Sequence, residues 1–543
     1  MENTKTVGLK LNTKRTFIIG FAFFGILMLW QVYNTYCPVI LTELLSNSMN
    51  TTDELEVQWV VGILMAADNV LALFMLPLFG FLSDRTKSPL GKRMPYIIIG
   101  TILASITLML IPLLFALNSL VGVVIVMALT LIFMNLYRNP AVSLMPDITP
   151  KPLRAKANGI INLVGYLGAI AAGGIAMFIT TTKYFSQSGD GFQGWQIYIP
   201  FLIAAVLMIG TMIFMAIKIK ENKVLKDIEP DMIEGEKQAD LHETLESSSL
   251  ILNPIYIKVD LDTLDRYNKK YEKSRHYFDN KLEHAIDKDN QKEINDFTYQ
   301  NKKLDKEYFA LVGVSYATAH NNRESLKYKN VGKLSKADRF NLTVIIIAVF
   351  LWFAGFNAVE TFWSNYSTYF INFSQMGLAV IVLTVCSLVA FIPAGLLSNK
   401  IGRKWVVIIG LVLIVLALGA GYFLSTLETA GEATTYGILY FVIFGVSGIG
   451  WAFINCCSYP MVVEFATKDN VGKFTGIYYT FSMLAQSLTP IALGFLLKQL
   501  SAWNIVFLYS TILMAAALVV FLFVRGVKNK KTAKKGLEAY DSD

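Results

Sequence analysis

Residues 80–93 read GFLSDRTKSPLGKR, and this stretch decides the fold class of the chain. An apolar run precedes it and a second one, residues 94–115, follows it. Two membrane-length runs joined by a short basic loop with Gly, Pro and one Asp predict a turn between two spanning helices. The pattern recurs at residues 395–404, GLLSNKIGRK, again between two apolar runs. A repeat this far along the chain indicates two homologous halves.

The composition is that of a membrane protein. Apolar residues make up 54% of the 543 residues and charged residues only 16%, against about 25% charged in soluble proteins. The net charge of +8 does not indicate nucleic acid, because basic residues sit at alternate ends of apolar runs. The four cysteines lie in or beside apolar segments, without the pattern of a disulfide framework. We therefore expect no nucleic-acid partner, no cofactor and no metal.

A spanning helix needs about 20 largely apolar residues. Twelve stretches meet this requirement: residues 17–45, 57–82, 94–116, 120–145, 155–180, 196–219, 340–370, 376–398, 403–425, 433–463, 473–497 and 502–525. A second internal match supports the duplication, since Asp147 precedes Gly159 by the same number of positions as Glu464 precedes Gly476. The sequence thus predicts an all-α membrane protein of two six-helix pseudo-repeats, related by an axis along the membrane normal.

The composition changes between the sixth and seventh runs. Residues 221–338 are polar and charged, have no membrane-length run and contain all 4 histidines. We expect six-helix bundles in residues 1–220 and 339–543, with this insert between them. Apolar positions at helical spacing around Tyr271 and Tyr308, and a candidate strand at residues 255–259, favour a small folded domain. A mostly solvated linker is the alternative.

The distribution of basic residues predicts the topology. One set of loops carries most of them, and Lys183 and Lys498 are the basic residues of the opposite set. Because positive charge stays in the cytoplasm, we expect a multi-pass protein of the cell membrane with both termini and the insert cytoplasmic. We also expect a monomer in the lipid bilayer.

The loop pattern G-x-x-x-D-R…G-[KR]-R, with its copy in the second half, resembles the signature of the major facilitator superfamily. The resemblance covers the chain except residues 221–338. Within the superfamily, SDRTKSPLGKRMP and residues 140–147 and 154–158 are similar to the glycoside–pentoside–hexuronide:cation symporters, particularly the sucrose and maltose proton symporters and their bacterial relatives. Two positions depart from that pattern: Val142 stands where the plant proteins have arginine, and Asn399 where the first half has Asp84.

The resemblance implies a major facilitator fold and a gate in the basic loops. It places Asp84 near a helix N-terminus of the other half and directs Arg85 toward Asp147, and opposite charges at helix ends make such contacts favourable. The expected gating residues are Gly80, Asp84, Arg85, Arg93, Asp147, Arg154, Arg403 and Glu464.

Three charged residues lie well inside predicted spans, away from their ends: Asp68 in the second, Arg138 in the fourth and Glu360 in the seventh. A charge there costs about 2.5–3.5 kcal/mol unless it faces a cavity or a partner. The predicted spans contain no histidine, so proton coupling would use carboxylates. Our hypothesis is that Asp68 carries the proton, that Arg138 tunes it, and that Glu360 is a second acid or a sugar ligand. A static Asp–Arg pair that locks helix packing is the alternative.

Sugars require many hydrogen-bonding groups and flat apolar faces. The first, fourth, seventh and tenth spans offer both, and in the resembled superfamily these helices line the central cavity. The expected substrate-binding residues are Gln31, Tyr33, Asn34, Asn135, Asn139, Asn357, Trp363 and Asn455. For each aromatic side chain, lipid contact or core packing is the alternative.

The favoured function is proton-coupled uptake of a sugar, such as sucrose or maltose, by alternating access. Sodium coupling, or a nucleoside, drug or lysolipid as substrate, is the alternative within this fold. A different class is a transporter-like sensor that signals through the insert, and concentrative uptake would separate the two. We expect no enzyme, since no nucleophile–base pair, metal cluster or phosphate-binding Gly loop is evident.

Overall fold

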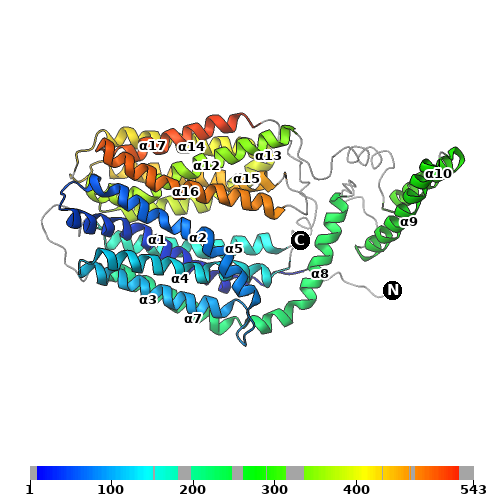
Figure 1. Cartoon of the computed structure of the whole chain (residues 1–543), viewed down its shortest axis with the longest axis horizontal. Coiled ribbons are helices and arrows are strands. Elements are labelled where there is room, and N and C mark those ends of the chain that lie inside the picture. The colour runs from blue at the N-terminus through cyan, green and yellow to red at the C-terminus, as the bar shows by residue number, and fades with distance from the viewer. Residues whose placement is uncertain are drawn as a thin grey trace. The chain divides into compact units, whose positions relative to one another are not determined.

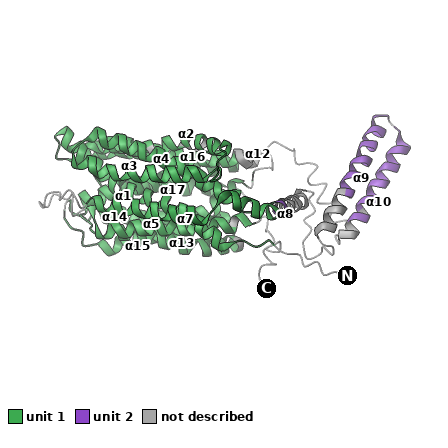
Figure 2. Cartoon of the chain, turned by 90° about the horizontal axis from the view of Figure 1, so that it is seen from below, with its two compact units in different colours: residues 1–232, 334–528 green, residues 233–333, 529–543 purple. Residues whose placement is uncertain are grey.

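The computed structural model describes residues 9–150, 153–181, 197–247, 261–288, 290–312, 336–430, 432–463, 465 and 471–524. Within these ranges, the description leaves out the side chains of residues 68, 73, 76, 77, 155, 236–247, 261–269, 306, 309–312, 336–338, 399 and 471–473. The chain divides into two compact units, which are residues 1–232 with 334–528 and residues 233–333 with 529–543 (Figure 2).

Among the residues that the structure describes, the first unit contains 12 helices that are long and apolar enough to span a membrane (Figure 1). The first six are α1 (Thr13–Met49), α2 (Gln58–Arg85), α3 (Met94–Ala116), α4 (Leu120–Asp147), α5 (Arg154–Phe178) and α7 (Tyr198–Lys218). The other six are α12 (Lys336–Asn365), α13 (Met376–Ile401), α14 (Arg403–Ser425), α15 (Gly437–Val463), α16 (Val471–Leu500) and α17 (Ile505–Leu522). The predicted all-helical fold of twelve spans is confirmed.

Local sequence signals set the ends of these helices. α1 begins after Asn12, whose Oδ1 accepts a hydrogen bond from the backbone N–H of Arg15 at 3.0 Å. It ends at Asn50, where the backbone turns left-handed with φ 53°. Its 37 residues extend about 55 Å at 1.5 Å per residue, so it projects beyond a hydrocarbon core of about 30 Å. A short 3₁₀ turn, η1 (Glu54–Val57), precedes α2, and a π turn, η4 (Tyr366–Phe370), continues α12.

The same helix pairings recur in both halves of the chain. α1 packs on α5 and α7, as α12 packs on α16 and α17. α3 packs on α4 and α7, as α14 packs on α15 and α17, and α2–α4 corresponds to α13–α15. Each half buries its own cluster of apolar side chains. The pairings are those of two six-helix pseudo-repeats, as the repeated loop predicted.

The halves meet through α2 against α16 and α5 against α13. Glycines allow these backbones to approach closely, as is common between membrane helices. A Cβ on Gly62 of α2 would lie 2.0 Å from the Pro490 carbonyl oxygen of α16, and one on Gly377 of α13 would lie 2.6 Å from the Gly173 carbonyl oxygen of α5. These crossings lie toward one end of the bundle, which we call the acidic end because its loops carry Asp53, Glu54, Glu56, Glu428 and Glu432. The opposite end, with loops 86–93 and 148–153, is called the basic end.

Buried polar contacts join the halves at the acidic end. Asn365 of α12 donates from Nδ2 to Thr42 Oγ1 at 2.9 Å and to Gln58 Oε1 at 2.8 Å, and all three residues are fully buried. Thr181 hydrogen-bonds Thr368, and Tyr369 donates to the Val39 carbonyl oxygen at 3.4 Å. Separating the halves here would leave buried polar groups without partners, which costs free energy. The network therefore helps to hold this end closed.

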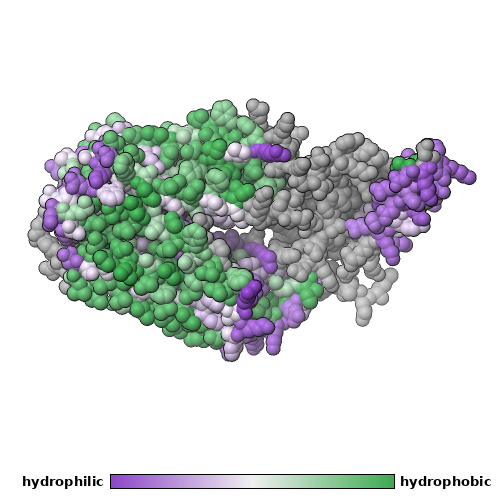
Figure 3. Space-filling model, viewed as in Figure 1, coloured by the Kyte–Doolittle hydropathy of each residue, from purple (hydrophilic) through white to green (hydrophobic). Residues whose placement is uncertain are grey.

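The surface of the bundle agrees with a bilayer environment. Hydrophobic residues cover its flank in the space-filling view, while hydrophilic residues gather toward its two ends (Figure 3). In the same view the surface is hollowed between the two halves toward the basic end.

The second unit contains α9 (Leu261–Asp287) and α10 (Gln291–Val312), which pack on each other as an antiparallel pair. The rings of Tyr271 and Tyr308 stack with centroids 4.1 Å apart, and Arg275 Nη1 donates to Asp305 Oδ1 at 2.7 Å. The amphipathic patterns in the insert thus correspond to packed helices. The candidate strand at residues 255–259 lies outside the described residues.

Candidate substrate cavity and gate

A cavity of about 210 Å³ lies between the two halves. α1 and α5 line it from the first half, and α12, α13, α14 and α15 from the second. Its walls are mostly aromatic and aliphatic with a few polar groups, which is typical of small-molecule sites. The polar residues on the wall are Gln31, Asn34, Thr35, Tyr166, Glu360, Ser364, Thr384, Ser387 and Ser447.

One face of α1 supplies a continuous part of this wall. Its lining residues are Leu27, Trp30, Gln31, Asn34 and Thr35, which follow the i, i+3, i+4, i+7, i+8 spacing of a single helical face. Gln31 Nε2 donates to Thr35 Oγ1 at 3.3 Å. The predicted ligands Gln31 and Asn34 are therefore on the cavity. Tyr33 is off this face and is 2% exposed, inside the first half.

Aromatic rings form flat parts of the wall. Trp451 of α15 stacks on Phe356 of α12 with centroids 3.9 Å apart and planes 9° apart. The predicted ligand Trp363 packs on Phe444 at 4.4 Å and donates from Nε1 to the Met376 carbonyl oxygen at 3.3 Å. These contacts fix the rings, so a planar or ring-shaped solute meets preorganised faces.

Glu360 faces the inside of the bundle and not lipid. It lines the cavity and also a smaller pocket beside it, and its side chain is exposed to that space. A carboxylate within a spanning helix is tolerated where it faces a water-filled cavity. This position fits either predicted role, as acid or as sugar ligand.

The smaller pocket has a volume of about 20 Å³. It is lined by Trp30, Asn34, Met65, Asn69, Asn357, Glu360, Thr361, Gln486 and Pro490, and we call it the amide pocket. α1 and α2 contribute to it from one half, α12 and α16 from the other. Asn69 is 9% exposed and Asn357, a predicted ligand, is 7% exposed. A buried water needs roughly 10–15 Å³, so the pocket has room for one such group.

The other predicted ligands lie away from both linings. Asn135 is fully buried in the first half and donates from Nδ2 to the Leu131 carbonyl oxygen at 2.9 Å. Asn139 packs against Gly80, where an added Cβ would lie 2.5 Å from its Nδ2. Asn455 donates to the Trp451 carbonyl oxygen at 2.9 Å. These amides bond or pack against the protein itself. Residue type alone cannot distinguish such a structural amide from one that binds a ligand.

Several lining residues were not predicted. Thr384 and Ser387 of α13 lie one turn apart on the cavity wall, and Tyr166 of α5 lies on the opposite half. Asn69 and Gln486 line the amide pocket. A hydroxyl in an apolar helix often bonds its own backbone, as Thr384 Oγ1 does to the Val380 carbonyl oxygen at 2.8 Å. The amides Asn69 and Gln486 carried the stronger signal, because an amide is costly in lipid.

Arg138 lies beside the cavity wall. Its guanidinium carbon is 5.2 Å from the ring centroid of Trp30, which lines both the cavity and the amide pocket. Such an arrangement is a cation–π contact. Asp68 is on α2 immediately before Asn69, and its side chain lies outside the described part of the structure. The predicted Asp68–Arg138 relation thus stays a prediction.

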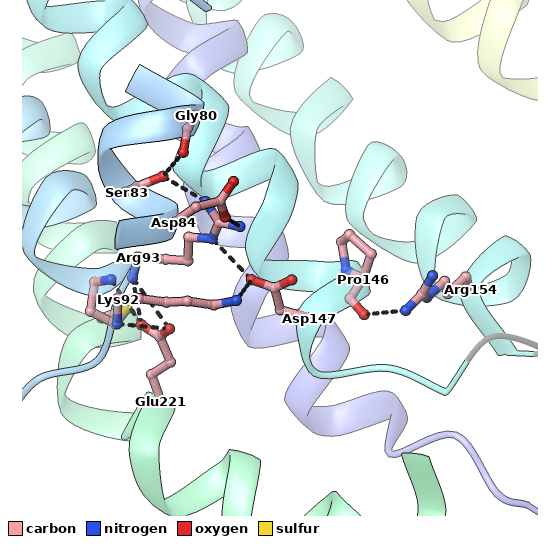
Figure 4. Close-up of polar contacts among 10 residues, drawn as sticks. Gly80, Ser83, Asp84, Lys92, Arg93, Pro146, Asp147, Arg154 and Glu221 are labelled. Carbon is pink, nitrogen blue, oxygen red and sulfur yellow. Dashed lines mark hydrogen bonds and ion pairs between the residues drawn. The ribbon is translucent and has the colours of Figure 1, made fainter. Parts of the chain in front are cut away.

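Arg93 is the centre of the contacts at the basic end (Figure 4). Only 5% of its side chain is exposed, and it bonds Asp84, the Ser83 hydroxyl and Asp147, the last at 2.9 Å from Nε. Lys92 adds a second contact to Asp147 at 3.0 Å. The guanidinium has several donors in a rigid plane, which suits it to join three partners from α2 and α4.

The structure corrects one expected gate contact. Asp147 pairs with Lys92 and Arg93, whereas the Arg85 guanidinium lies over the Phe81 ring at 3.9 Å from its centroid. Asp84 pairs with Arg93 of its own half, and among the described residues no ion pair joins it to the second half. The cause is the direction of the side chains, because Arg93 enters α3 facing α4 while Arg85 ends α2.

Two of the remaining expected gate residues, Arg154 and Arg403, begin helices α5 and α14. Arg154 donates to the Pro146 carbonyl oxygen at 2.9 Å and to the Thr149 carbonyl oxygen at 3.1 Å (Figure 4). Arg403 is the first residue of α14 and half-buried. Glu464 and the side chain of Asn399 lie outside the described residues.

Sequence reasoning missed Glu221, the first residue of α8 (Glu221–Ser247). Its fully buried carboxylate accepts hydrogen bonds from the backbone N–H groups of Lys92, Arg93 and Met94 at 2.9–3.2 Å. An anion at the N-terminus of α3 satisfies donors that the helix itself leaves unpaired. Gly91, with φ +115°, leaves room for the carboxylate, because a Cβ there would lie 2.2 Å from Glu221 Oε2. The start of the insert therefore supports the signature loop.

Twelve spans in two pseudo-symmetric halves around a central cavity define the class of two-half membrane transporters. The family profile described as Major Facilitator Superfamily matches residues 16–368 and 337–539. The chain belongs to this family and is a multi-pass membrane transporter of it. A search of curated proteins found no match.

Solved structures of the superfamily share the fold. The xylose transporter XylE from E. coli, in a partially occluded inward open conformation, is 13% identical with a TM-score of 0.54, over 95% of this chain and 99% of that one. A point mutant of the nucleoside transporter NupG is 12% identical with a TM-score of 0.56, over 95% and 100%. A peptide transporter POT in complex with sulfate is 14% identical with a TM-score of 0.55, over 94% and 93%. At these identities the likeness concerns the fold alone.

Proposed function

We propose that this transporter is a proton-coupled symporter that takes up a sugar of the disaccharide or glycoside class. The observation that carries the proposal is the cavity between the halves, where Glu360 stands among aromatic faces and amide groups. A carboxylate in such a cavity can bind and release a proton, while rings and amides match the apolar faces and hydroxyls of a sugar.

Transport proceeds by alternating access in this proposal. The basic end faces the cytoplasm by the positive-inside rule, so both termini and the insert are cytoplasmic in the cell membrane. The buried contacts around Asn365 and the glycine crossings then close the outer side. Rocking of one half against the other about the cavity would open that side and close the basic end.

The proposed role of Asp68 rests on its place within the second span, and the other roles on residues that line the cavity, the amide pocket or the basic end. Asp68 is the primary proton carrier, Arg138 tunes it, and Glu360 is a second acid or a sugar ligand. Gln31, Asn34, Asn357 and Trp363 are the proposed substrate ligands that line the cavity or the amide pocket. Arg93, with Asp84 and Asp147, holds the gate loop in this conformation.

Uptake by the purified full chain in liposomes tests the proposal. The panel includes sucrose, maltose and xylose, with uridine and a dipeptide as controls because the structural neighbours transport such classes. We expect a proton gradient to drive accumulation of a sugar, and Asp68→Asn to abolish accumulation while exchange continues. Accumulation driven by sodium alone, or of uridine or the dipeptide alone, overturns the proposal. Sugar binding without accumulation under any gradient indicates a sensor.

A further inference from the structure

The amide pocket is a polar site in which Asn69 and Gln486 have no role in the proposed coupling. It adjoins the main cavity, because Trp30, Asn34 and Glu360 line both. Its other polar walls come from Asn69 of α2, Asn357 of α12 and Gln486 of α16. Polar groups that converge from four helices in the interior of a membrane bundle are costly unless a ligand or water satisfies them.

Asn69 gives the clearest indication of a ligand. Its side chain is nine-tenths buried at 9% exposure and lines the pocket. Among the described residues it has no hydrogen-bond partner. By contrast, Gln486 Nε2 already donates to the Ser482 carbonyl oxygen at 3.1 Å. An amide that opens onto a pocket and has no protein partner among the described residues indicates that something else completes the site.

The chemistry of the pocket selects among possible occupants. Amides present both donors and acceptors, and Glu360 presents acceptors. A hydroxyl group is both donor and acceptor, so it can pair with an amide and a carboxylate at once. An apolar group would leave these atoms unpaired, and a bare cation would meet the N–H donors of the amides.

We propose that the amide pocket is the subsite that receives one hydroxyl-bearing group of the sugar, such as a hydroxymethyl. The inference rests on the proposed function and adds a determinant of its specificity. A volume of about 20 Å³ admits one such group and not a sugar ring. Since residues of both halves form the pocket, a hydroxyl bound there contacts both halves.

Binding of maltose and sucrose, and of their monodeoxy derivatives, to the purified full chain tests this inference. We expect one deoxy position to lower affinity about tenfold or more, because the pocket's groups then stay unpaired. Asn69→Leu, which is close to isosteric, should bind the parent sugar and that deoxy derivative almost equally. Val70→Leu, on the exposed face of the same helix turn, is the matched control and should discriminate like the unmodified chain.

Each outcome decides the question. If every deoxy derivative binds like its parent, or if Asn69→Leu weakens all sugars equally, the subsite is refuted while the proposed function stands. If neither sugar binds, both fall. If sodium chloride raises the thermal midpoint of the sugar-free chain, relative to choline chloride, and Asn69→Leu removes that rise, the pocket is an ion site and the inference is wrong. Should Asn69→Leu fail to fold, Gln486→Leu serves in its place.

Discussion

At the scale of single residues, Glu360 places a charge inside a spanning helix, which is unfavourable in lipid, at a position that lines the cavity. Its side chain faces the cavity and the amide pocket, so water or solute can solvate the carboxylate. The position of Glu360 inside a predicted span indicated that its carboxylate faces a cavity or a polar partner, because contact with lipid would be unfavourable. Which helices provide the solvating groups was visible only in the folded chain.

Glu360→Gln separates the two roles proposed for this residue. An amide cannot carry the proton but keeps the size and one acceptor, so we expect gradient-driven accumulation to fall at least tenfold if Glu360 couples. Exchange of sugar across the membrane at equal pH should then stay within about twofold. A rise in KM with accumulation intact would assign Glu360 to sugar binding alone. The measurement is paired counterflow and gradient-driven uptake in liposomes.

Glu221 acts at the same scale as a cap on α3. Glu221→Gln keeps the shape but removes the charge at the helix N-terminus, and we expect a loss of about 0.5–2 kcal/mol. Thermal unfolding in detergent should show a lower apparent midpoint. Glu229→Gln, on an exposed turn of the same helix, is the control and should leave the midpoint unchanged. Equal midpoints for both variants would contradict the capping role.

At the scale of elements, glycine crossings decide how the halves close. A Cβ at Gly62 would lie 2.0 Å from a backbone carbonyl oxygen of α16, which cannot rotate away as a side chain can. The α2–α16 crossing must therefore open to accept alanine. The α5–α13 crossing has the same construction, as the two pseudo-repeats require.

Gly62→Ala should shift the chain toward a conformation open at the acidic end. Gly174→Ala is the matched control, because a Cβ there has nothing within 4 Å. We expect a cysteine introduced at Gln31, with the native cysteines replaced, to react faster with an impermeant maleimide added on the acidic side. The expected increase is severalfold in Gly62→Ala and absent in Gly174→Ala. Unchanged labelling in both would show that this crossing does not limit opening.

At the scale of the whole molecule, the helical bundle and the α9–α10 hairpin of the insert each have their own internal contacts. The buried clusters of the two halves draw on Ile228 and Met232 of α8, and then on residues from Leu342 onward. α9 and α10 have their own contacts, through the Tyr271–Tyr308 stack and Arg275 with Asp305. This supports a division in which residues 233–333 form a unit of their own, while the start of the insert, residues 221–232, belongs to the bundle.

Replacing residues 248–333 by a flexible Gly/Ser linker should leave the bundle folded. We expect the purified variant to elute as a monodisperse species, with a thermal midpoint within about 3 °C of the full chain, because no described core contact is removed. Sugar uptake then shows whether the insert regulates transport. Aggregation, or a midpoint lower by more than about 10 °C, would show that the bundle depends on the hairpin.

The sequence alone determined the twelve spans, the duplication and the location of the gate loop. These depend on local composition and on a repeat that reads directly along the chain. It also placed Gln31 and Asn34 on one face of α1, since helical periodicity is a local property. Tyr33, on the same helix, shows where prediction from residue type fails. A tyrosine indicated a ligand, but this position of the helix faces the buried core of the first half.

Only the tertiary structure decided which faces meet. Membrane helices are apolar on most sides, so their sequences carry little indication of their rotation or partners. The amide pocket unites Asn69, Asn357 and Gln486 from three helices, and Glu221 reaches a loop 128 positions away at Arg93. Such contacts are fixed by close packing of small residues and by the cost of unpaired polar groups in an apolar interior, and both are properties of the assembled bundle.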